Sequence, residues 1–113
     1  MDDFPETNFK DKVIEIIKDI PYGRVTTYGT VATLAGSSRS AREVGYILHS
    51  STKKHNLPWQ RVINRHGFLS VRGGDVNIKS VQKSLLEQEG VEVSKDFMVD
   101  LEKYFWSASE DNF

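Results

Sequence analysis

The 113-residue sequence predicts a single, mainly α-helical domain with a small β-hairpin. Three observations support this fold class. Apolar residues recur at the helical period of 3.6 over most of the chain, glycines and prolines separate the periodic segments, and only one short stretch resembles two strands around a turn. A hydrophobic content of 38% over this length is enough for one core, so residues 1–113 are expected to form one domain.

The first two helices are predicted from their apolar spacing and their end signals. Asn8 can cap a helix that Pro21 ends. The apolar residues of this helix follow the helical period: Phe9, Val13, Ile16, Ile17 and Ile20. A short helix is then expected over residues 29–35, since Gly36 is a typical helix stop.

A third helix is expected to start between Ser38 and Ser40 and to continue towards Ser50. Its inward residues are spaced by three and four positions: Ala41, Val44 and Leu48. Together with the preceding short helix it gives a helix-turn-helix pattern. Many helical domains contain such a pair, so the pattern alone does not define a function.

The β-hairpin is predicted from Val62–Ile63 and Phe68–Leu69, which flank residues 64–67 and could serve as a wing. A fourth helix is expected over Val76–Glu89, with Gly90 as its stop. Its inward residues are expected to be Ile78, Val81 and Leu85. Four further apolar residues indicate a last packing segment: Phe97, Leu101, Tyr104 and Phe105.

The charge is distributed unevenly along the chain. The formal net charge is −1, but residues 24–72 contain one acidic residue, Glu43, against eight basic ones. These are Arg24, Arg39, Arg42, Lys53, Lys54, Arg61, Arg65 and Arg72. Residues 1–23 and 73–113 are both acidic overall. A basic centre between acidic ends indicates a face that binds a polyanion; a solvated loop region is the alternative.

The composition argues against several kinds of chemistry. The chain has no cysteine, which removes disulfides, thiolate nucleophiles and cysteine metal sites. Its three histidines lack a metal-ligand spacing, and neither a serine elbow nor a phosphate-loop motif occurs. No metal and no cofactor are therefore expected. No signal peptide and no apolar run of membrane-spanning length occur either, so the protein is expected inside the cell.

Four stretches of the chain resemble a known family: IPYGRVTTYGTVATLAG, SAREVG, LPWQRVIN and LLEQEGVEV, in this order. They are similar to the DNA-binding domain of O6-alkylguanine-DNA alkyltransferases, the C-terminal domain type of methylated-DNA-protein cysteine methyltransferases. That family has Pro-Cys-His-Arg where this chain has Pro58-Trp59-Gln60-Arg61, and its cysteine takes the alkyl group from the lesion. With a tryptophan at this place, the short chain resembles the alkyltransferase-like proteins, which bind alkylated guanine without repairing it. The resemblance implies a winged helix-turn-helix-like fold.

The resemblance also implies roles for residues of the two short helices. Tyr28 matches a tyrosine that pushes on the phosphate of the target nucleotide, and Arg42 matches an arginine that fills the gap left by the flipped base. Both residue types suit these roles, because a phenol can crowd and hydrogen-bond a phosphate and a planar guanidinium stacks on bases. The residues expected to contact DNA, through the minor groove, are Thr27, Tyr28, Ser40, Ala41, Arg42 and Gly45.

The resemblance implies a pocket for the flipped base. Its expected lining residues are Tyr28, Pro58, Trp59, Val62 and Arg72. Trp59 would offer an apolar surface to the alkyl group, and Arg72 would lie against the base. Alternatives stay open for three of them: Tyr28 and Trp59 as core aromatics, and Arg72 as a phosphate contact.

The resemblance therefore implies a DNA damage sensor and not an enzyme. Its partners would be double-stranded DNA containing O6-alkylguanine and nucleotide excision repair proteins. The chain would act as a monomer, in the nucleus of a eukaryote or the cytoplasm of a bacterium. Gln60 replaces the family histidine that, with a glutamate matching Glu89, activates the cysteine, and Ser51 stands where the enzyme has a hinge asparagine. The catalytic relay would therefore be interrupted at two positions in addition to Trp59.

Two other functions are the alternatives. A helix-turn-helix transcription regulator would need a dimer surface and sequence-specific contacts in the major groove. A residual transferase or hydrolase would lack its nucleophile, because the chain has no cysteine.

Overall fold

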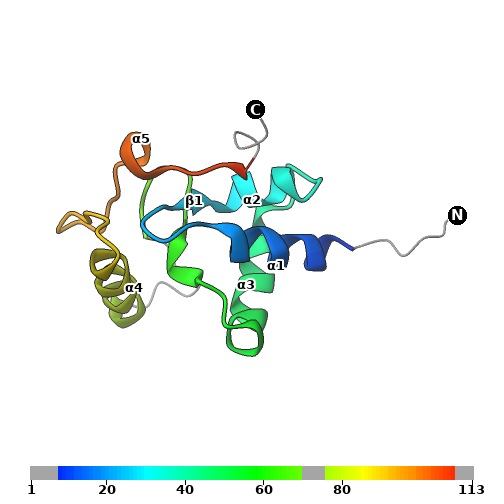
Figure 1. The fold of residues 1–113 in the computed structure, drawn as a ribbon, viewed down its shortest axis with the longest axis horizontal. Coiled ribbons are helices and arrows are strands. Elements are labelled where there is room, and N and C mark those ends of the chain that lie inside the picture. The colour runs from blue at the N-terminus through cyan, green and yellow to red at the C-terminus, as the bar shows by residue number, and fades with distance from the viewer. Residues whose placement is uncertain (1–7, 70–75, 109–113) are drawn as a thin grey trace, which may run out of the picture.

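The computed structural model describes residues 8–69 and 76–108. Helices dominate it and the two strands are short (Figure 1), so the mainly helical fold class with a small β element is confirmed. The elements in chain order are α1 (Phe9–Asp19), β1 (Thr26–Thr27), α2 (Tyr28–Leu34), α3 (Ala41–His55), the 3-10 helix η1 (Trp59–Arg61), β2 (Val62–Ile63), α4 (Val76–Gln88) and α5 (Leu101–Tyr104).

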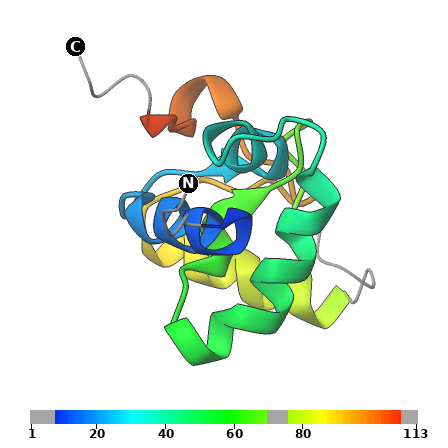
Figure 2. The same ribbon diagram turned by 90° about the vertical axis from the view of Figure 1, so that its right-hand side faces the viewer.

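The first three helices pack against one another, and Figure 2 looks nearly along α1 with α2 and α3 beside it. α1 begins as predicted, because the side chain of Asn8 accepts a hydrogen bond of 2.8 Å from the amide of Asp11. α3 is longer than predicted: it continues to His55, and Asn56 ends it in the left-handed conformation with φ of 52°. Basic residues in its last turn suit the helix dipole, and Ser51 in this half of the helix is buried.

The predicted β-hairpin is wrong. Val62–Ile63 pairs in parallel with Thr26–Thr27, and Phe68 forms an antiparallel bridge with Met98. The chain does reverse direction after Asn64, whose Oδ1 accepts hydrogen bonds from two of the amides that follow it. The local turn signal was therefore correct. Each flanking segment takes its pairing partner from a distant part of the chain, which a local pattern does not reveal.

Strand β2 joins two hydrophobic cores. Successive side chains of a strand point to opposite faces, so Val62 packs in one core and Ile63 in the other, each fully buried. The first core is formed mainly by α1, α2 and α3: Val13, Ile14, Ile17, Ile20, Val31, Ala32, Ala35, Val44, Ile47, Leu48, Leu57 and Val62. The second core contains Val25, Ile63, Leu69, Leu86, Val91, Val93, Val99 and Tyr104.

The inward face of α4 differs from the prediction. Ile78 and Val81 are 37% and 52% exposed, whereas Gln82 is 1% exposed. Gln82 is buried because its Nε2 donates hydrogen bonds to the backbone oxygens of Gln60, at 3.1 Å, and of Val62, at 3.3 Å. An amide side chain thus occupies an inward position because it satisfies two carbonyl groups that only the packing of α4 on η1 brings near.

An ion pair connects the residue that follows α4 to η1 and to the end of α1. The guanidinium of Arg61 donates to both carboxylate oxygens of Glu89 at 3.0–3.1 Å, and its Nη1 donates to the backbone oxygen of Ile20 at 2.8 Å. Glu89 also accepts hydrogen bonds of 2.8 Å from the amide of Gly23 and from Nε2 of Gln60. Burial by itself would raise the pKa of Glu89, but the hydrogen bonds from Arg61, Gly23 and Gln60 outweigh it and hold this pKa below its usual value. We call the five residues joined by these hydrogen bonds the Arg61–Glu89 cluster: Ile20, Gly23, Gln60, Arg61 and Glu89.

Gly67 allows the segment after β2 to approach a later segment closely. Its φ is 91°, in the left-handed region, and a Cβ on this residue would lie 2.6 Å from the backbone oxygen of Val99. The amide of Val99 donates a hydrogen bond of 2.8 Å to the backbone oxygen of Gly67. A side chain at this position would have to push the two segments apart.

The variant Gly67→Ala should destabilise the fold. We expect a loss of roughly 2–4 kcal/mol in the free energy of unfolding, because alanine meets both a left-handed backbone and a steric clash. Urea unfolding followed by circular dichroism measures this loss. The matched control is Gly36→Ala, where φ is 102° but no described heavy atom lies within 4 Å of a new Cβ. The control should lose only about 1–2 kcal/mol, and equal losses for the two variants would contradict the close approach at Gly67.

The variant Glu89→Gln should be less stable than the wild type at neutral pH, with a smaller difference in acid. A carboxylate with a depressed folded pKa stabilises the fold above its unfolded pKa of about 4.3, and this contribution disappears as the pH falls through the folded pKa. We expect a loss of about 2–4 kcal/mol at pH 7, because the partly buried Arg61 loses its charged partner. Urea unfolding between pH 7 and pH 3 measures it.

The control for this variant is Glu92→Gln. Glu92 pairs with Lys103 at 3.3 Å, but both side chains are largely exposed, so no measurable change is expected. A loss for Glu89→Gln that stays constant down to pH 3 would show that its charge is not what stabilises the cluster.

Candidate nucleic-acid interface

A cleft of about 700 Å³ lies among α2, α3, η1 and α4. Figure 1 shows η1 between α3 and α4, which explains how one short turn reaches a cleft that both helices line. The cleft is lined by Tyr28, Gly29, Ser38, Ala41, Arg42, Gly45, Leu48, His49, Thr52, Trp59, Asn64, Arg65, Ile78 and Gln82. Five of the residues expected to contact DNA or to line the pocket for the flipped base meet in this cleft: Tyr28, Ala41, Arg42, Gly45 and Trp59.

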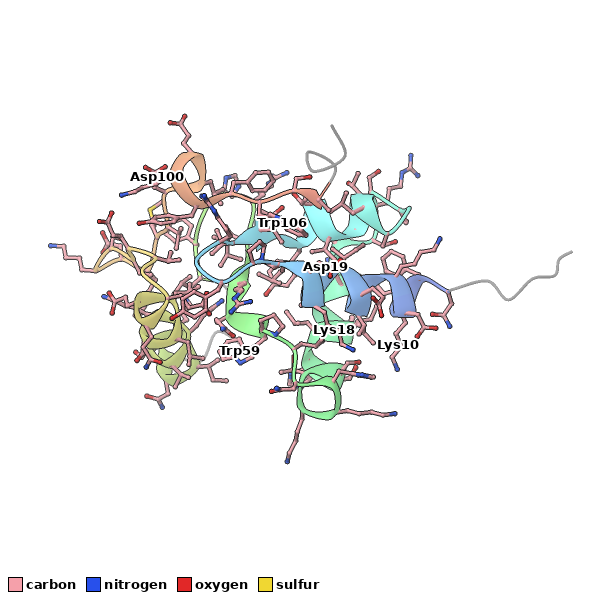
Figure 3. All side chains as sticks on the ribbon, viewed as in Figure 1. Lys10, Lys18, Asp19, Trp59, Asp100 and Trp106 are labelled. Atoms are coloured by element: carbon pink, nitrogen blue, oxygen red, sulfur yellow. The ribbon has the colours of Figure 1, made fainter. Side chains whose placement is uncertain are left out.

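Trp59 lies on η1, in the region between α3 and α4 (Figure 3). The amide of Trp59 donates a hydrogen bond of 2.8 Å to the backbone oxygen of Leu57. Pro58, with φ of −76° and ψ of 67°, is the centre of this inverse γ-turn and fixes the direction in which the indole leaves the chain. The half-buried indole packs on the first core and also lines the cleft.

Tyr28 begins α2 and packs over Gly45 of α3. A Cβ placed on Gly45 would lie 3.9 Å from Cε1 of Tyr28, which is ordinary van der Waals contact. Burial raises the pKa of the Tyr28 phenol above its usual value. The phenol therefore stays protonated at neutral pH and retains an O–H group that can donate a hydrogen bond.

The start of α3 combines an exposed guanidinium with helix N-terminal amides. Arg42, in the first turn, is exposed and lines the cleft. Ser40 occupies the N-cap position, but its hydroxyl bonds to Oγ of Ser37 at 2.7 Å and does not cap the helix. The dipole of α3 adds partial positive charge at this end, which favours an anion such as a phosphate.

Thr27 is placed beside the cleft and does not line it. Its Oγ1 accepts a hydrogen bond of 3.1 Å from the amide of Thr30, so it is the N-cap of α2. Thr27 lines a second hollow of about 510 Å³, which shares Gly29 and Ser38 with the first. The two hollows therefore adjoin at the start of α2.

Two other residues expected in the pocket, Pro58 and Val62, do not line the cleft. Val62 is fully buried in the first core, so its side chain is a packing group. Pro58 is half-buried and acts through the turn that it imposes on Trp59. Arg72 lies outside the described residues.

Several lining residues were not among those expected from the sequence to contact the DNA backbone or the flipped base. Asn64 and Arg65 follow β2, while Ile78 and Gln82 belong to α4, and all four reach the cleft. No local signal marks the last two, because they reach the cleft through the packing of α4 on η1. His49 did have a signal, since it lies two helical turns after Arg42 on the same helix face.

Exposed basic side chains lie on α3 and on the turn before it: Arg39, Arg42, Lys53 and Lys54. Arg61 is not available to a polyanion, because Glu89 engages its guanidinium. Within residues 8–69 and 76–108, no three acidic or histidine side chains are grouped closely enough to hold a metal ion. None of the described helices is both long enough and apolar enough to span a membrane.

Known proteins resemble the chain in sequence. The family model described as the 6-O-methylguanine DNA methyltransferase DNA binding domain matches residues 8–91. The DNA base-flipping protein of Escherichia coli (strain K12) is 46% identical over 102 residues, which cover 90% of this chain and 77% of that protein. Alkyltransferase-like protein 1 of Schizosaccharomyces pombe is 37% identical over 103 residues, covering 87% and 94% of the two chains.

Solved structures show the same relationship. The crystal structure of S. pombe Atl1 in complex with damaged DNA containing O6-carboxymethylguanine matches with a TM-score of 0.80 at 34% identity, covering 92% of this chain and 99% of that one. The O6-methylguanine methyltransferase of Mycobacterium tuberculosis matches with a TM-score of 0.54 at 34% identity, covering 77% of this chain and 51% of that one. The chain therefore belongs to the family of the 6-O-methylguanine DNA methyltransferase DNA-binding domain, as an alkyltransferase-like member.

Proposed function

We propose that this protein is a non-enzymatic sensor of O6-alkylguanine in double-stranded DNA. In this proposal α3 docks in the minor groove, the damaged nucleotide is flipped into the cleft beside Trp59, and Arg42 fills the space that it leaves. The observation that supports it most directly is the cleft itself, which Tyr28, Arg42 and Trp59 line together from three different elements. The similarity to S. pombe Atl1, solved with DNA containing O6-carboxymethylguanine, supports the same class of ligand.

The cleft suits a flipped base. Its volume of about 700 Å³ lies within the range of small-molecule pockets and leaves room for a purine and an alkyl group. The indole of Trp59 supplies an apolar wall for the alkyl group. Flipping costs a few kcal/mol, and less for a poorly paired base, so alkylation at O6 favours extrusion by weakening the pair with cytosine.

The surface around α3 suits a nucleic-acid backbone. Gly45 has no side chain to hold the helix away from the groove, and the N-terminal amides of α3 favour a phosphate. Tyr28 keeps its phenolic proton and can donate to a phosphate oxygen. The minor groove displays few differences between sequences, which suits a sensor that must work in any sequence context.

The proposal excludes transfer of the alkyl group to the protein. The chain has no cysteine to accept it. Gln60 donates a hydrogen bond of 2.8 Å to Glu89, so it occupies a position from which a histidine could act as a base. The amide of glutamine cannot take up a proton as an imidazole does.

We also propose, by family resemblance, that the protein acts as a monomer. By family resemblance, we further propose that the bound protein recruits nucleotide excision repair proteins to the lesion. This would take place in the nucleus of a eukaryote or in the cytoplasm of a bacterium.

A binding titration tests the proposed function. Two duplexes of identical sequence carry either guanine or O6-methylguanine at one position, and we expect the lesion duplex to bind at least about tenfold more tightly, because its weaker pair lowers the cost of flipping. Fluorescence anisotropy over a series of salt concentrations gives the affinities and the number of phosphate contacts. A helix-turn-helix transcription regulator would bind both duplexes alike, and that result would refute the sensor function.

The variant Arg42→Ala should lose about 1–3 kcal/mol of binding free energy for the lesion duplex, because the gap left by the flipped base stays unfilled. The same titration measures this loss, and circular dichroism checks that the exposed side chain is dispensable for folding. Lys10→Ala is the control, since Lys10 lies on α1, away from Trp59 (Figure 3), and should change the affinity little. An equal loss for the two variants would remove Arg42 from the proposed role.

The variant Trp59→Cys should transfer methyl groups very slowly or not at all. A thiol with the ordinary pKa of about 8.5 is only a few per cent thiolate at neutral pH, and Gln60 cannot accept its proton. The double variant Trp59→Cys with Gln60→His should be faster, because Glu89 is placed to orient the new imidazole. Single-turnover transfer from labelled O6-methylguanine DNA, at equal lesion occupancy, compares the two. Equal rates would mean that Gln60 contributes nothing to the loss of chemistry.

A further inference from the structure

We infer that Phe68 and Met98 form a docking surface for a short segment of a second protein, one that presents an apolar side chain between basic ones. We call these two residues the Phe68–Met98 surface. Neither of them lines the cleft. Asp100, two positions after Met98, lies apart from Trp59 (Figure 3). The inference therefore goes beyond the proposed function and holds whichever DNA the cleft binds.

The two side chains are neighbours across an antiparallel bridge, and both are held in solvent. Phe68 is 40% exposed and Met98 is 39% exposed. The ladder hydrogen bonds lie on either side of the pair, donated by the amides of Leu69 at 2.9 Å and Val99 at 2.8 Å. Phe68 and Met98 are therefore a non-hydrogen-bonded pair, the type in which facing side chains lie closest. Their exposed parts form one apolar surface.

The outward backbone groups of both residues are already satisfied. The N–H of Phe68 donates to Oδ1 of Asn64, and its carbonyl oxygen accepts from the amide of Asn64. The N–H of Met98 donates to Oγ of Ser94, and its carbonyl oxygen accepts from the amide of Ser94. This edge therefore offers no backbone group to which a further strand could bond. Only the two side chains remain for a partner.

A strained residue keeps Met98 on the outside. Phe97 has a φ of 64°, in the left-handed region that a bulky side chain rarely adopts. It ends a three-residue hairpin loop at the place where glycine is usual. Its ring packs on the second core, and Nζ of Lys83 lies 5.7 Å from the ring centroid. The fold thus maintains the outward position of the next residue, Met98, at a cost in backbone strain, which is typical of a functional site.

The rim of the surface is acidic. Residues 92–103 contain four acidic residues against two basic ones. Asp96 and Asp100 are both exposed, two positions before and two positions after Met98. Such a rim repels a nucleic-acid backbone and attracts basic side chains. The charge therefore favours a protein segment with basic residues as the occupant.

The size of the surface favours a short segment over a folded domain. Two side chains offer much less area than a stable interface between folded domains. The phenyl ring of Phe68 supplies a flat apolar platform, and the flexible thioether of Met98 adapts to the shape of the group placed on it. The apolar side chain of the partner would lie on these two residues, with its basic neighbours at Asp96 and Asp100.

Methyl NMR detects binding directly at this surface, because the chain has only two methionines. The full chain, labelled with carbon-13 at its methionine methyl groups, is titrated with a short synthetic peptide of alternating lysine and leucine. The signal of Met98, assigned by its loss in Met98→Leu, should shift until it saturates. A peptide with serine in place of leucine, or with glutamate in place of lysine, should bind at least about fivefold more weakly.

The variant Phe68→Ser should weaken the lysine–leucine peptide at least about fivefold, while the signal of Met98 still reports binding. Phe105→Ser is the matched control, because Phe105 is another phenylalanine with 39% exposure. It should leave the affinity for the peptide unchanged. Circular dichroism checks that both variants fold.

Other results would overturn the inference. Equal peptide binding by the wild type and Phe68→Ser would place the peptide elsewhere, and equal binding of the serine or the glutamate peptide would remove the apolar or the charge selection. A loss of affinity for the lesion duplex in Phe68→Ser would assign the surface to DNA. A Met98 signal that moves with protein concentration alone would assign it to a contact between copies of this chain. The peptide titrations contain no DNA, so their outcome does not depend on the proposed function.

Discussion

The Arg61–Glu89 cluster is the constraint on which the position of the cleft depends. Its hydrogen bonds join the end of α1, the turn before β1, η1 and the residue that follows α4, four places far apart in the chain. A paired buried charge adds little net stability compared with apolar packing, but removing one partner is costly, so such a cluster favours one arrangement over others. Because η1 contains both Arg61 and Trp59, the arrangement that satisfies the ion pair also places the indole at the cleft.

The two cores fix the position of the chain segment that forms the Trp59 side of the cleft. Val62 follows η1 directly and belongs to the first core, while Ile63 belongs to the second, so the strand after the tryptophan is fixed on both faces. The indole of Trp59 packs on the first core with one side and lines the cleft with another. The wall of the cleft is therefore an extension of the core, which restricts the motion of the indole and keeps the site formed in the absence of a ligand.

Two polar groups, one on α4 and one directly after it, hold η1 and the start of β2 in place. Glu89 holds the side chain of Gln60, and Gln82 holds the backbone on either side of Arg61. In the proposed function, the first contact lies where a related enzyme would need a proton relay, and the amide of Gln60 cannot take up a proton. The second holds the backbone of the turn in place. In the proposed function, the same helix thus supports binding where a related enzyme needs support for chemistry.

Much of this protein follows from local sequence. Three features act through neighbours within a few positions and are therefore visible in the chain itself. They are the cap at Asn8, the periodic apolar residues of α1 to α3 and the turn at Asn64. The absence of cysteine and the Pro-Trp-Gln-Arg stretch are also sequence properties, and they indicated a family member without its nucleophile.

Other features depended on contacts between distant segments. The parallel pairing of β1 with β2, the burial of Val62 and the inward face of α4 each require a partner 20 or more positions away. The clearest case is Gln82: its period on α4 marks it as polar and outward, and it is buried because two backbone carbonyl groups of the neighbouring turn need a donor. A buried backbone acceptor must be satisfied, and this requirement can override the hydrophobic pattern of a helix.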